Sequence, residues 1–338
     1  MFTTQHQYIE RDSGKICTER LYADGAVKFL YSNARENAPM LFKALTSAWG
    51  SSLFGYINYN AIIGSKVSRG KGPFHPDGIN LDECVDNHNT LNTTRKVFER
   101  KIRYWECRPM SEEPSAIVAP SDSRVLVGSF CETSKLFLKE KFFGYEELLG
   151  RNKREWLRAF LNGKFAVFRL TPEKYHYNHT PVAGKVVDFY ELEGNYHACN
   201  PGAVVAMVTP YSKNKRVITV IDTDVPGGTK AGFVVMIEIV ALMIGKIVQC
   251  YSEKGYDRPQ QVRTGIFFIK GLPKSLYLPG SSTTVLIFQK ERVMFAEDLI
   301  RNMSRQDVES RFSKGFGMSL VETDVKVRSF IASAVNIG

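Results

Sequence analysis

The chain has 338 residues, of which 43% are hydrophobic and 24% are charged. These values are typical of globular proteins and exclude a disordered or collagen-like chain, while the length allows one large domain or two modest ones. Lys and Arg outnumber Asp and Glu by 45 to 35, and the resulting net charge of +10 indicates an anionic partner, such as nucleic acid, an acidic membrane surface or an anionic substrate.

The first part of the chain, up to about residue 110, has mostly helical patterns. It begins with MFTTQHQYIERDSGK, which is neither a secretory signal nor an Arg-rich transit peptide. Apolar residues at helical spacing predict helices over 26–31, 39–49 and 94–105. Residues 71–89 are rich in Gly, Pro, Asp and His and predict an irregular loop.

One stretch of this helical part, residues 44–65, has no charged side chain. Gly, Ser, Thr and Asn interrupt it, so it falls short of the roughly 20 apolar residues that a membrane-spanning helix needs. We interpret it as a helical segment that is either buried or lies on a membrane surface.

After about residue 110 the pattern changes to short runs of β-branched and apolar residues between turns. These runs predict strands over 116–119, 124–127, 165–170, 203–208, 216–221 and 284–288, and helical patterns interrupt them over 145–149 and 153–161. Because strands and helices do not alternate regularly, a doubly wound parallel sheet is disfavoured. The predicted fold is α+β, with a mainly β core of short strands in residues 111–338 and a helical N-terminal region in residues 1–110.

The six cysteines are scattered and include no CxxC pair, which argues against a structural zinc site and against a disulfide framework. A reducing compartment fits this usage, so we expect the protein in the cytoplasm or at the surface of a membrane. No recognised nucleic-acid-binding pattern accompanies the basic charge, and we expect no nucleic-acid partner.

Three local patterns carry candidate chemistry. Asp122 lies at the tip of a polar Pro-Ser-Asp-Ser turn between two apolar runs. His176 and His179 lie three residues apart, and a clustered pair of imidazoles can act as base, acid or orienting group near neutral pH. No nearby Cys, Asp or Glu completes a zinc site at regular spacing, so no metal is expected.

The third pattern is a hydroxyl-rich turn, Leu278-Pro-Gly-Ser-Ser-Thr-Thr, that leads directly into an apolar strand. A Ser in such a turn can attack its own preceding carbonyl and convert the amide into an ester. β-Elimination then breaks the chain and leaves a pyruvoyl group at the new N-terminus. Its ketone can form a Schiff base and act as an electron sink, as pyridoxal phosphate does in other enzymes.

In this order, Pro-x-Asp, Tyr-His-x-x-His-x-Pro-Val-x-Gly and Gly-Ser-Ser-Thr before a strand resemble the phosphatidylserine decarboxylase family. The most specific segment is FRLTPEKYHYNHTPVAG over 168–184, and the resemblance extends to residues 7–11, 29–32, 92–102, 236–247 and 270–271. It implies a carboxy-lyase made as a zymogen and cleaved near 281/282 into a large and a small chain, and it leaves a homodimer open.

The resemblance also implies roles for single residues. Asp122, His179 and the Ser of the Gly-Ser motif would form the self-cleavage triad, in which the His deprotonates the Ser as in hydrolase triads. That Ser would become the pyruvoyl cofactor. His176 would face the substrate during decarboxylation.

Two serines, Ser281 and Ser282, compete for the cleavage site. A Gly-Ser rule selects Ser281, because Gly280 permits a strained turn. The register of the following strand selects Ser282, because members of the family place Phe six residues after the pyruvoyl Ser, and Phe288 lies six residues after Ser282 but seven after Ser281. We favour Ser282.

The sequence departs from the family around the substrate pocket and the cleavage turn. Pro-Ser-Asp-Ser replaces Pro-Ala-Asp-Gly, Tyr177 replaces an Arg, and Lys-Gly-Leu-Pro-Lys-Ser lacks the Glu and the second Gly of the KGxExG segment. Phosphatidylserine is the favoured substrate because of the basic charge and the uncharged stretch at 44–65. A soluble amino acid is the alternative substrate, and a non-catalytic basic binding protein with the same fold is the alternative function.

Overall fold

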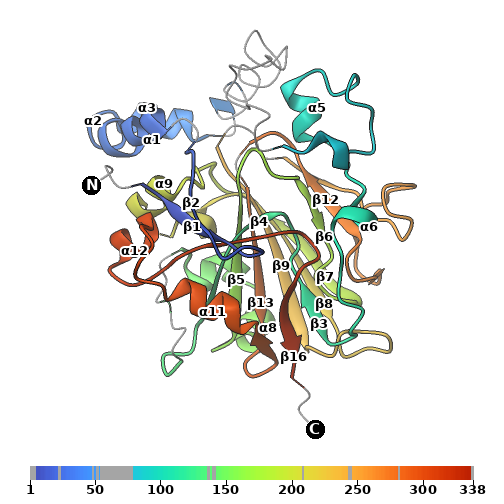
Figure 1. Ribbon diagram of the computed structural model, residues 1–338. Coiled ribbons are helices and arrows are strands. Elements are labelled where there is room, and N and C mark those ends of the chain that lie inside the picture. Colours follow the sequence, from blue (N-terminus) through green and yellow to red (C-terminus); the bar gives the residue numbers. More distant parts are fainter. Residues whose placement is uncertain are drawn as a thin grey trace.

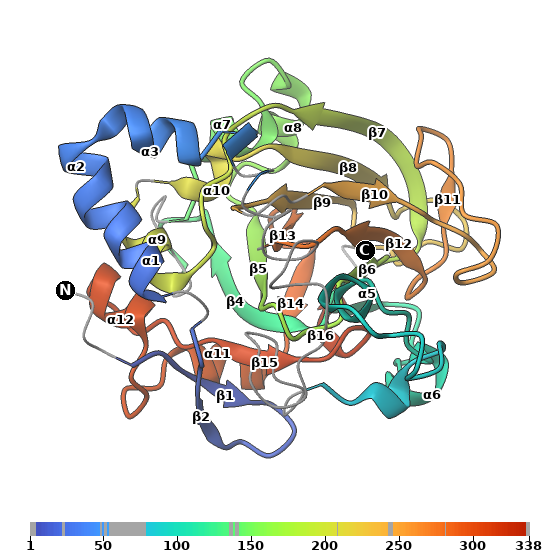
Figure 2. The same cartoon turned by 90° about the horizontal axis from the view of Figure 1, so that it is seen from above.

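The structure is a computed structural model that describes residues 5–21, 24–47, 49–50, 53, 79–134, 138, 142–207, 209–242, 246–280 and 282–335. Its centre is a curved main sheet (Figures 1 and 2). In spatial order, its ten described strands are β11 (Phe267–Phe268), β7 (Gly184–Leu192), β8 (Arg216–Asp222), β9 (Phe233–Val240), β13 (Ser282–Phe288), β5 (Lys164–Leu170), β4 (Ser123–Ser129), β15 (Thr323–Val325), β1 (Gln7–Glu10) and β2 (Ile16–Thr18).

Two three-stranded sheets accompany the main sheet. Their strand orders are β10 (Ile247–Gln249), β12 (Pro273–Tyr277), β6 (Tyr177–His179) and β14 (Val293–Phe295), β16 (Phe330–Ala334), β3 (Ala116–Val118). All strand pairs are antiparallel except β1 with β15. The fold class predicted from the sequence, α+β with a β-rich core, is therefore confirmed.

Strand β13 lies at the centre of the core. All seven of its residues are buried, and it pairs along its whole length with β5 on one side and β9 on the other. A strand that is covered on both faces requires a continuous run of apolar and β-branched residues, which Thr284–Phe288 supplies. The residue that starts β13 is consequently held in a fixed register.

Short helices surround the sheets. They are α1 (Asp24–Lys28), the π-helix η1 (Phe29–Ala34), α2 (Arg35–Asn37), α3 (Pro39–Leu45), the 3₁₀-helix η3 (Leu81–Glu83), α5 (Thr94–Phe98), α6 (Tyr104–Cys107), α7 (Tyr145–Leu149), α8 (Arg154–Ala159), α9 (Pro201–Ala206), α10 (Pro210–Lys213), α11 (Glu297–Met303) and α12 (Arg311–Phe316). Helices α1–α3 lie on one side of the molecule and α6 on the other (Figures 1 and 2).

Most of the predicted elements form. The helix predicted over 39–49 ends earlier, at Leu45, and the loop predicted over 71–89 lies outside the described residues up to 78 and contains η3 after that. Two further elements differ in kind or continuity. The predicted strand over 203–208 is wrong, because helix α9 covers Pro201–Ala206. Its N-terminus is stabilised by the Asn200 side chain, which accepts a hydrogen bond from the Gly202 amide at 2.8 Å. The predicted helix over 94–105 is divided into α5 and α6, because Ile102 between them forms a β-bridge with Cys84.

The N-terminal region is not entirely helical, since β1 and β2 extend the main sheet beside β15. The domain boundary near residue 110 stays a prediction. Most of the uncharged stretch 44–65 lies outside the described residues. Among the residues that are described, no helix has the length and apolar character needed to cross a bilayer.

Candidate active site

Three segments that are distant in the sequence meet beside β6. The amide of His179 donates to the Pro120 carbonyl at 2.7 Å, next to the Asp122 turn. The amide of Tyr277, at the end of β12, donates to the His176 carbonyl at 3.1 Å. Because β13 begins only five residues after Tyr277, the hydroxyl-rich turn starts beside the two histidines. The three sequence motifs therefore converge on one region.

His179 is fully buried and both of its ring nitrogens are occupied. Nδ1 lies 2.9 Å from the Gly271 carbonyl oxygen, and Nε2 lies 3.0 Å from the Tyr175 hydroxyl. A carbonyl oxygen can only accept, so Nδ1 carries the hydrogen and Nε2 is the basic nitrogen of the neutral ring. Burial lowers the pKa of His179 to about 3, although the Gly271 carbonyl and the charge of Asp122 oppose this shift.

His176 has a different environment. Its ring stacks on Phe98 with the centroids 3.5 Å apart, and neither ring nitrogen has a hydrogen-bond partner of good geometry among the described residues. Burial, and after it the positive charge of Arg100, hold the pKa of His176 well below its usual value. The imidazole is therefore neutral near pH 7, and neither of its nitrogens is satisfied by the described part of the chain.

Asp122 is held by an arginine rather than by a histidine. The Arg108 guanidinium donates to both carboxylate oxygens, at 3.0 and 2.7 Å, and the Val327 amide donates to one of them at 2.7 Å. Burial raises the pKa of Asp122, but Arg108, with smaller contributions from Lys174 and the Val327 amide, lowers the pKa below its usual value. Asp122 and His179 share no hydrogen bond, so the carboxylate acts on the imidazole through its charge. The sequence did not single out Arg108.

Ser282 is the first residue of β13 and is paired with Leu170 of β5 and Val240 of β9. Its side chain is buried, and its Oγ has no hydrogen-bond partner among the described residues. An orphaned buried hydroxyl is rare in native proteins and needs a reason. The preceding Gly280 has a φ of 151°, which a side chain would disfavour. Ser281 lies outside the described residues.

A buried polar network lies next to this turn. The Lys274 ammonium donates to the Glu238 carboxylate at 2.6 Å, and neither side chain is exposed. The Asn178 amide donates to the same carboxylate at 3.2 Å, and its oxygen accepts from the Thr284 hydroxyl at 2.9 Å. The network thus connects β12, β9, β6 and β13. A signal for it was present in the sequence, because Glu238 interrupts an apolar run.

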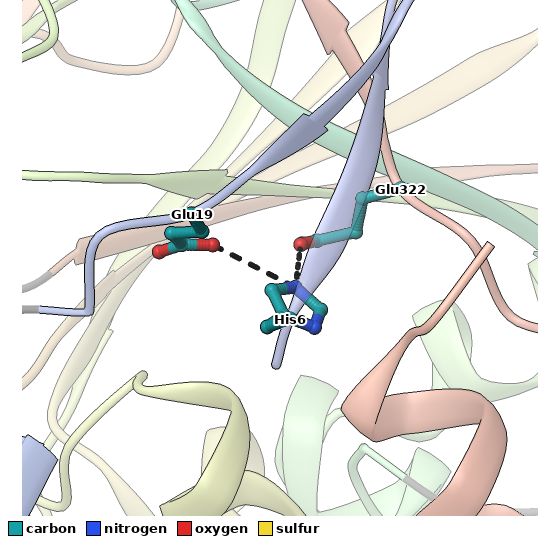
Figure 3. A group of neighbouring side chains, drawn as sticks. All are labelled: His6, Glu19 and Glu322. Carbon is teal, nitrogen blue, oxygen red and sulfur yellow. Dashed lines mark hydrogen bonds and ion pairs between the residues drawn. The ribbon is translucent and has the colours of Figure 1, made fainter. Parts of the chain in front are cut away.

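A second buried cluster is formed by His6, Glu19 and Glu322 (Figure 3). These residues lie next to the ends of β1, β2 and β15, respectively. His6 Nε2 lies 2.8 Å from a Glu322 oxygen and 3.6 Å from a Glu19 oxygen. The guanidinium of Arg169 contacts both carboxylates, and Arg124 also pairs with Glu19. Since the two arginines balance the two carboxylates, the cluster is an ion-pair network that binds the N-terminal segment to β4 and β5, and no metal centre is inferred from it.

Several known proteins are similar in sequence to this chain over most of its length. The profile of the family described as Phosphatidylserine decarboxylase matches residues 94–312. A phosphatidylserine decarboxylase proenzyme of Fusobacterium nucleatum subsp. nucleatum is 28% identical over 310 residues, which cover 91% of this chain and 95% of that protein. One from Chlamydia trachomatis serovar D is 26% identical with the same coverage.

A longer relative, phosphatidylserine decarboxylase proenzyme 2 of Oryza sativa subsp. japonica, is 31% identical over 68% of this chain and 34% of its own length. The family profile covers more than half of the chain and includes the Asp122 turn, both histidines and both serines. The chain therefore belongs to the phosphatidylserine decarboxylase family.

Proposed function

We propose that the chain is a self-processing, pyruvoyl-dependent decarboxylase that converts phosphatidylserine to phosphatidylethanolamine and CO₂. Membership of the family supports this proposal. The structural observation that carries it is the pair of backbone hydrogen bonds that join the Asp122 turn, the two histidines and the strand before the hydroxyl-rich turn. These are the segments in which the proposed reaction needs its nucleophile and its base.

The proposed nucleophile is the Ser282 hydroxyl. Its O–H bond breaks as its oxygen attacks the carbonyl carbon of residue 281, an ester C–O bond forms, and the amide C–N bond breaks with the proton passing to the nitrogen. Removal of the Ser282 Cα proton then breaks the Cβ–O bond and releases the large chain as a carboxylate. Tautomerisation and hydrolysis release ammonia and leave a pyruvoyl group.

The surroundings of Ser282 fit this assignment. Its Oγ is buried and has no partner among the residues that the structure describes, so none of them has to release it before attack. Strand β13 holds it in register between β5 and β9, and Gly280 supplies an unusual backbone angle next to the turn. The alternative nucleophile, Ser281, is kept as an outcome of the test.

The two histidines are assigned to different steps. His179, with Nε2 as its basic nitrogen, accepts a proton during processing, and the charge of Asp122 favours the imidazolium that results. The ketone of a pyruvoyl group supplies the electron sink for loss of CO₂. His176, neutral and without a good hydrogen-bond partner for either nitrogen in the described part of the chain, is assigned to hold or give a proton at the carbon that loses its carboxylate.

A lipid substrate requires contact with a bilayer. The N-terminal helical side exposes large apolar side chains: Phe29 is 59% exposed, Met40 82% and Trp49 76%. With the net charge of +10, these side chains suit an interfacial contact in which apolar groups enter the headgroup region and basic groups meet anionic lipid. We assign this side of the molecule to the membrane.

Substitution of each serine tests the processing step. Ser282→Ala is expected to leave one intact chain, whereas Ser281→Ala is expected to give residues 1–281 and 282–338. The reverse pattern would move the cut to the Gly280–Ser281 bond, and cleavage that persists in a Ser281→Ala/Ser282→Ala chain would refute processing at this turn.

A headgroup assay tests the substrate. Purified wild-type protein is expected to release CO₂ from phosphatidylserine vesicles and to form phosphatidylethanolamine, and Ser282→Ala is expected to be inactive. Release of CO₂ from free amino acids but not from vesicles would replace the lipid by a soluble substrate. An intact wild-type chain with neither activity would favour a binding protein.

A further inference from the structure

A line of hydrogen bonds runs from His179 to the backbone near α6. His179 Nε2 lies 3.0 Å from the Tyr175 hydroxyl, which lies 2.6 Å from the Tyr256 hydroxyl. Tyr256 in turn donates to the Ile102 carbonyl at 3.0 Å and accepts from the Ile102 amide at 3.2 Å. On the other side of the ring, Nδ1 donates to Gly271.

The number of hydrogens in this line depends on the charge of His179. Four contacts, Nδ1–Gly271, Nε2–Tyr175, Tyr175–Tyr256 and Tyr256–Ile102, each need one hydrogen. A neutral imidazole and two phenols supply three, so one contact is unmet. An imidazolium supplies the fourth, and every contact is then satisfied with the heavy atoms where they are. The same heavy-atom positions therefore accommodate the protonated ring without rearrangement, although burial keeps the resting ring neutral.

We propose that Tyr175 and Tyr256 form a hydrogen-bond relay that stabilises the His179 imidazolium when the ring takes up a proton during processing. The inference rests on the proposed self-processing reaction, in which the serine hydroxyl is the donor. In the neutral ring, Nε2 accepts from the Tyr175 hydroxyl at 3.0 Å. When Nε2 gains the proton that the serine O–H bond loses, the electron pair of that bond stays on the serine oxygen, and the Tyr175 hydroxyl changes from donor to acceptor of Nε2–H.

The phenol hydrogens then turn without further bond breaking. Nε2–H donates to Tyr175, Tyr175 donates to Tyr256, and Tyr256 donates to the Ile102 carbonyl. This arrangement opposes the burial that disfavours a charged imidazole. Tyr175 and Tyr256 are positioning residues in this scheme, because they act through His179.

Other groups around the ring also affect its charge. Arg328 and Arg108 lower the pKa of His179, whereas Asp122 raises it. The Tyr104 ring packs edge-on against the imidazole, with the centroids 4.8 Å apart. The substitutions below therefore leave Arg108, Asp122 and Arg328 in place, so that a change in processing can be attributed to the two tyrosines.

The first experiment follows processing of the full chain over time during cell-free synthesis. Tyr175→Phe and Tyr256→Phe are each expected to slow cleavage at least tenfold. Tyr251→Phe is the matched control, because its buried hydroxyl also donates to one carbonyl, Phe267 at 3.0 Å, and accepts from one amide, Ile269 at 2.9 Å. It is expected to stay within twofold of wild type.

A double substitution separates a relay from a general loss of stability. Because both tyrosines act in one line, Tyr256→Phe is expected to slow cleavage no further in a Tyr175→Phe chain. Tyr251→Phe is expected to change the cleavage rate by less than twofold in either background. Wild-type rates in Tyr175→Phe or Tyr256→Phe, or additive losses in the double variant, would overturn the relay.

A spectroscopic reading is independent of processing. In a Ser281→Ala/Ser282→Ala chain labelled with ¹⁵N-histidine, Tyr175→Phe is expected to shift the His179 Nε2 resonance toward that of an unbonded imine nitrogen, and Tyr251→Phe is expected to leave it in place. An unmoved resonance in Tyr175→Phe would refute the contact. If the wild-type chain does not cleave itself, the proposed function is wrong. The ¹⁵N measurement then still shows whether Tyr175 is hydrogen-bonded to His179 Nε2.

Discussion

His176 and His179 are neighbours in sequence but differ in what their nitrogens touch. His179 is fixed on both sides by Gly271 and Tyr175, whereas His176 stacks on Phe98 and neither of its nitrogens has a hydrogen-bond partner of good geometry among the described residues. A ring that is held in one tautomer suits a single proton transfer within the protein. A ring with open nitrogens suits contact with a substrate that arrives later.

This difference predicts that the two histidines can be separated by mutation. His179→Ala is expected to slow self-cleavage by roughly 10²–10⁴-fold, the usual contribution of a general base. His176→Ala is expected to be cleaved normally but to decarboxylate more slowly by a similar factor. Gel analysis of processing and CO₂ release measure the two steps. Failure of both variants to cleave would contradict the division of roles.

Burial of neutral imidazoles predicts a pH dependence of stability. The pKa of His179 is about 3 in the folded chain, below an unfolded value near 6.5. Between these two pH values the unfolded chain therefore carries a proton on His179 that the folded chain lacks. Stability is therefore lost as the pH falls below about 6.5, by about 2 kcal/mol between pH 7 and pH 5 for this one residue.

Urea unfolding of the Ser281→Ala/Ser282→Ala chain at pH 5, 6 and 7 measures this loss. Adding His179→Gln is expected to make the dependence shallower by that amount, whatever its effect on stability at pH 7. An unchanged slope would show that His179 does not stay neutral in the folded chain.

At the scale of the elements, the buried Lys274–Glu238 pair connects two strands near the cleavage turn. Strand β12 precedes the turn, and β9 pairs with β13, which follows it. Lys274→Met leaves the Glu238 carboxylate buried without its cation. In the Ser281→Ala/Ser282→Ala chain it is expected to lower the free energy of unfolding by about 3–5 kcal/mol. Lys274→Met combined with Glu238→Gln is expected to recover part of this loss. Urea unfolding of the three chains decides, and equal losses in the single and double variants would argue against a coupled pair.

Sequence pattern predicted those strands whose residues form a continuous apolar and β-branched run between turns, such as β5, β8 and β13. It failed at α9, where an apolar Ala-Val-Val-Ala run has the composition of a strand. There the decisive information lay outside the run, in an Asn cap and in Pro201 at the first helical position. Local capping outweighed β propensity.

The candidate site was predicted in part. Its histidines, Asp122 and the serine pair came from motif order, and the structure brings the three motifs together. Arg108 and Tyr256 could not be identified from the sequence, because each lies outside the motifs and reaches the site only through tertiary packing. The partner of Asp122 could therefore be known only from the fold.

At the scale of the whole molecule, the N-terminal segment contributes twice. Strands β1 and β2 complete one edge of the main sheet and are held by the buried cluster of His6, Glu19 and Glu322 with its two arginines. The following helices α1–α3 lie on one side of the molecule (Figure 2). In this segment Phe29 and Met40 are largely exposed. One segment thus combines a firm attachment to the core with a surface suited to lipid.

Vesicle flotation tests this surface. The wild-type chain is expected to float with phosphatidylserine vesicles at low salt and less at high salt, because charge attraction is screened. A Met40→Gln/Trp49→Gln chain is expected to float less at both salt concentrations. Trp105→Gln is the control, since Trp105 is 54% exposed on α6 at the opposite side. Equal flotation of all three chains would move the contact elsewhere.

Intact-mass analysis of the denatured wild-type protein tests the central claim most directly. Self-processing at Ser282 predicts two chains, residues 1–281 with a free carboxyl end and residues 282–338 whose first residue has the mass of a pyruvoyl group and resists N-terminal sequencing. A single chain of 338 residues in protein that releases CO₂ from phosphatidylserine would contradict it.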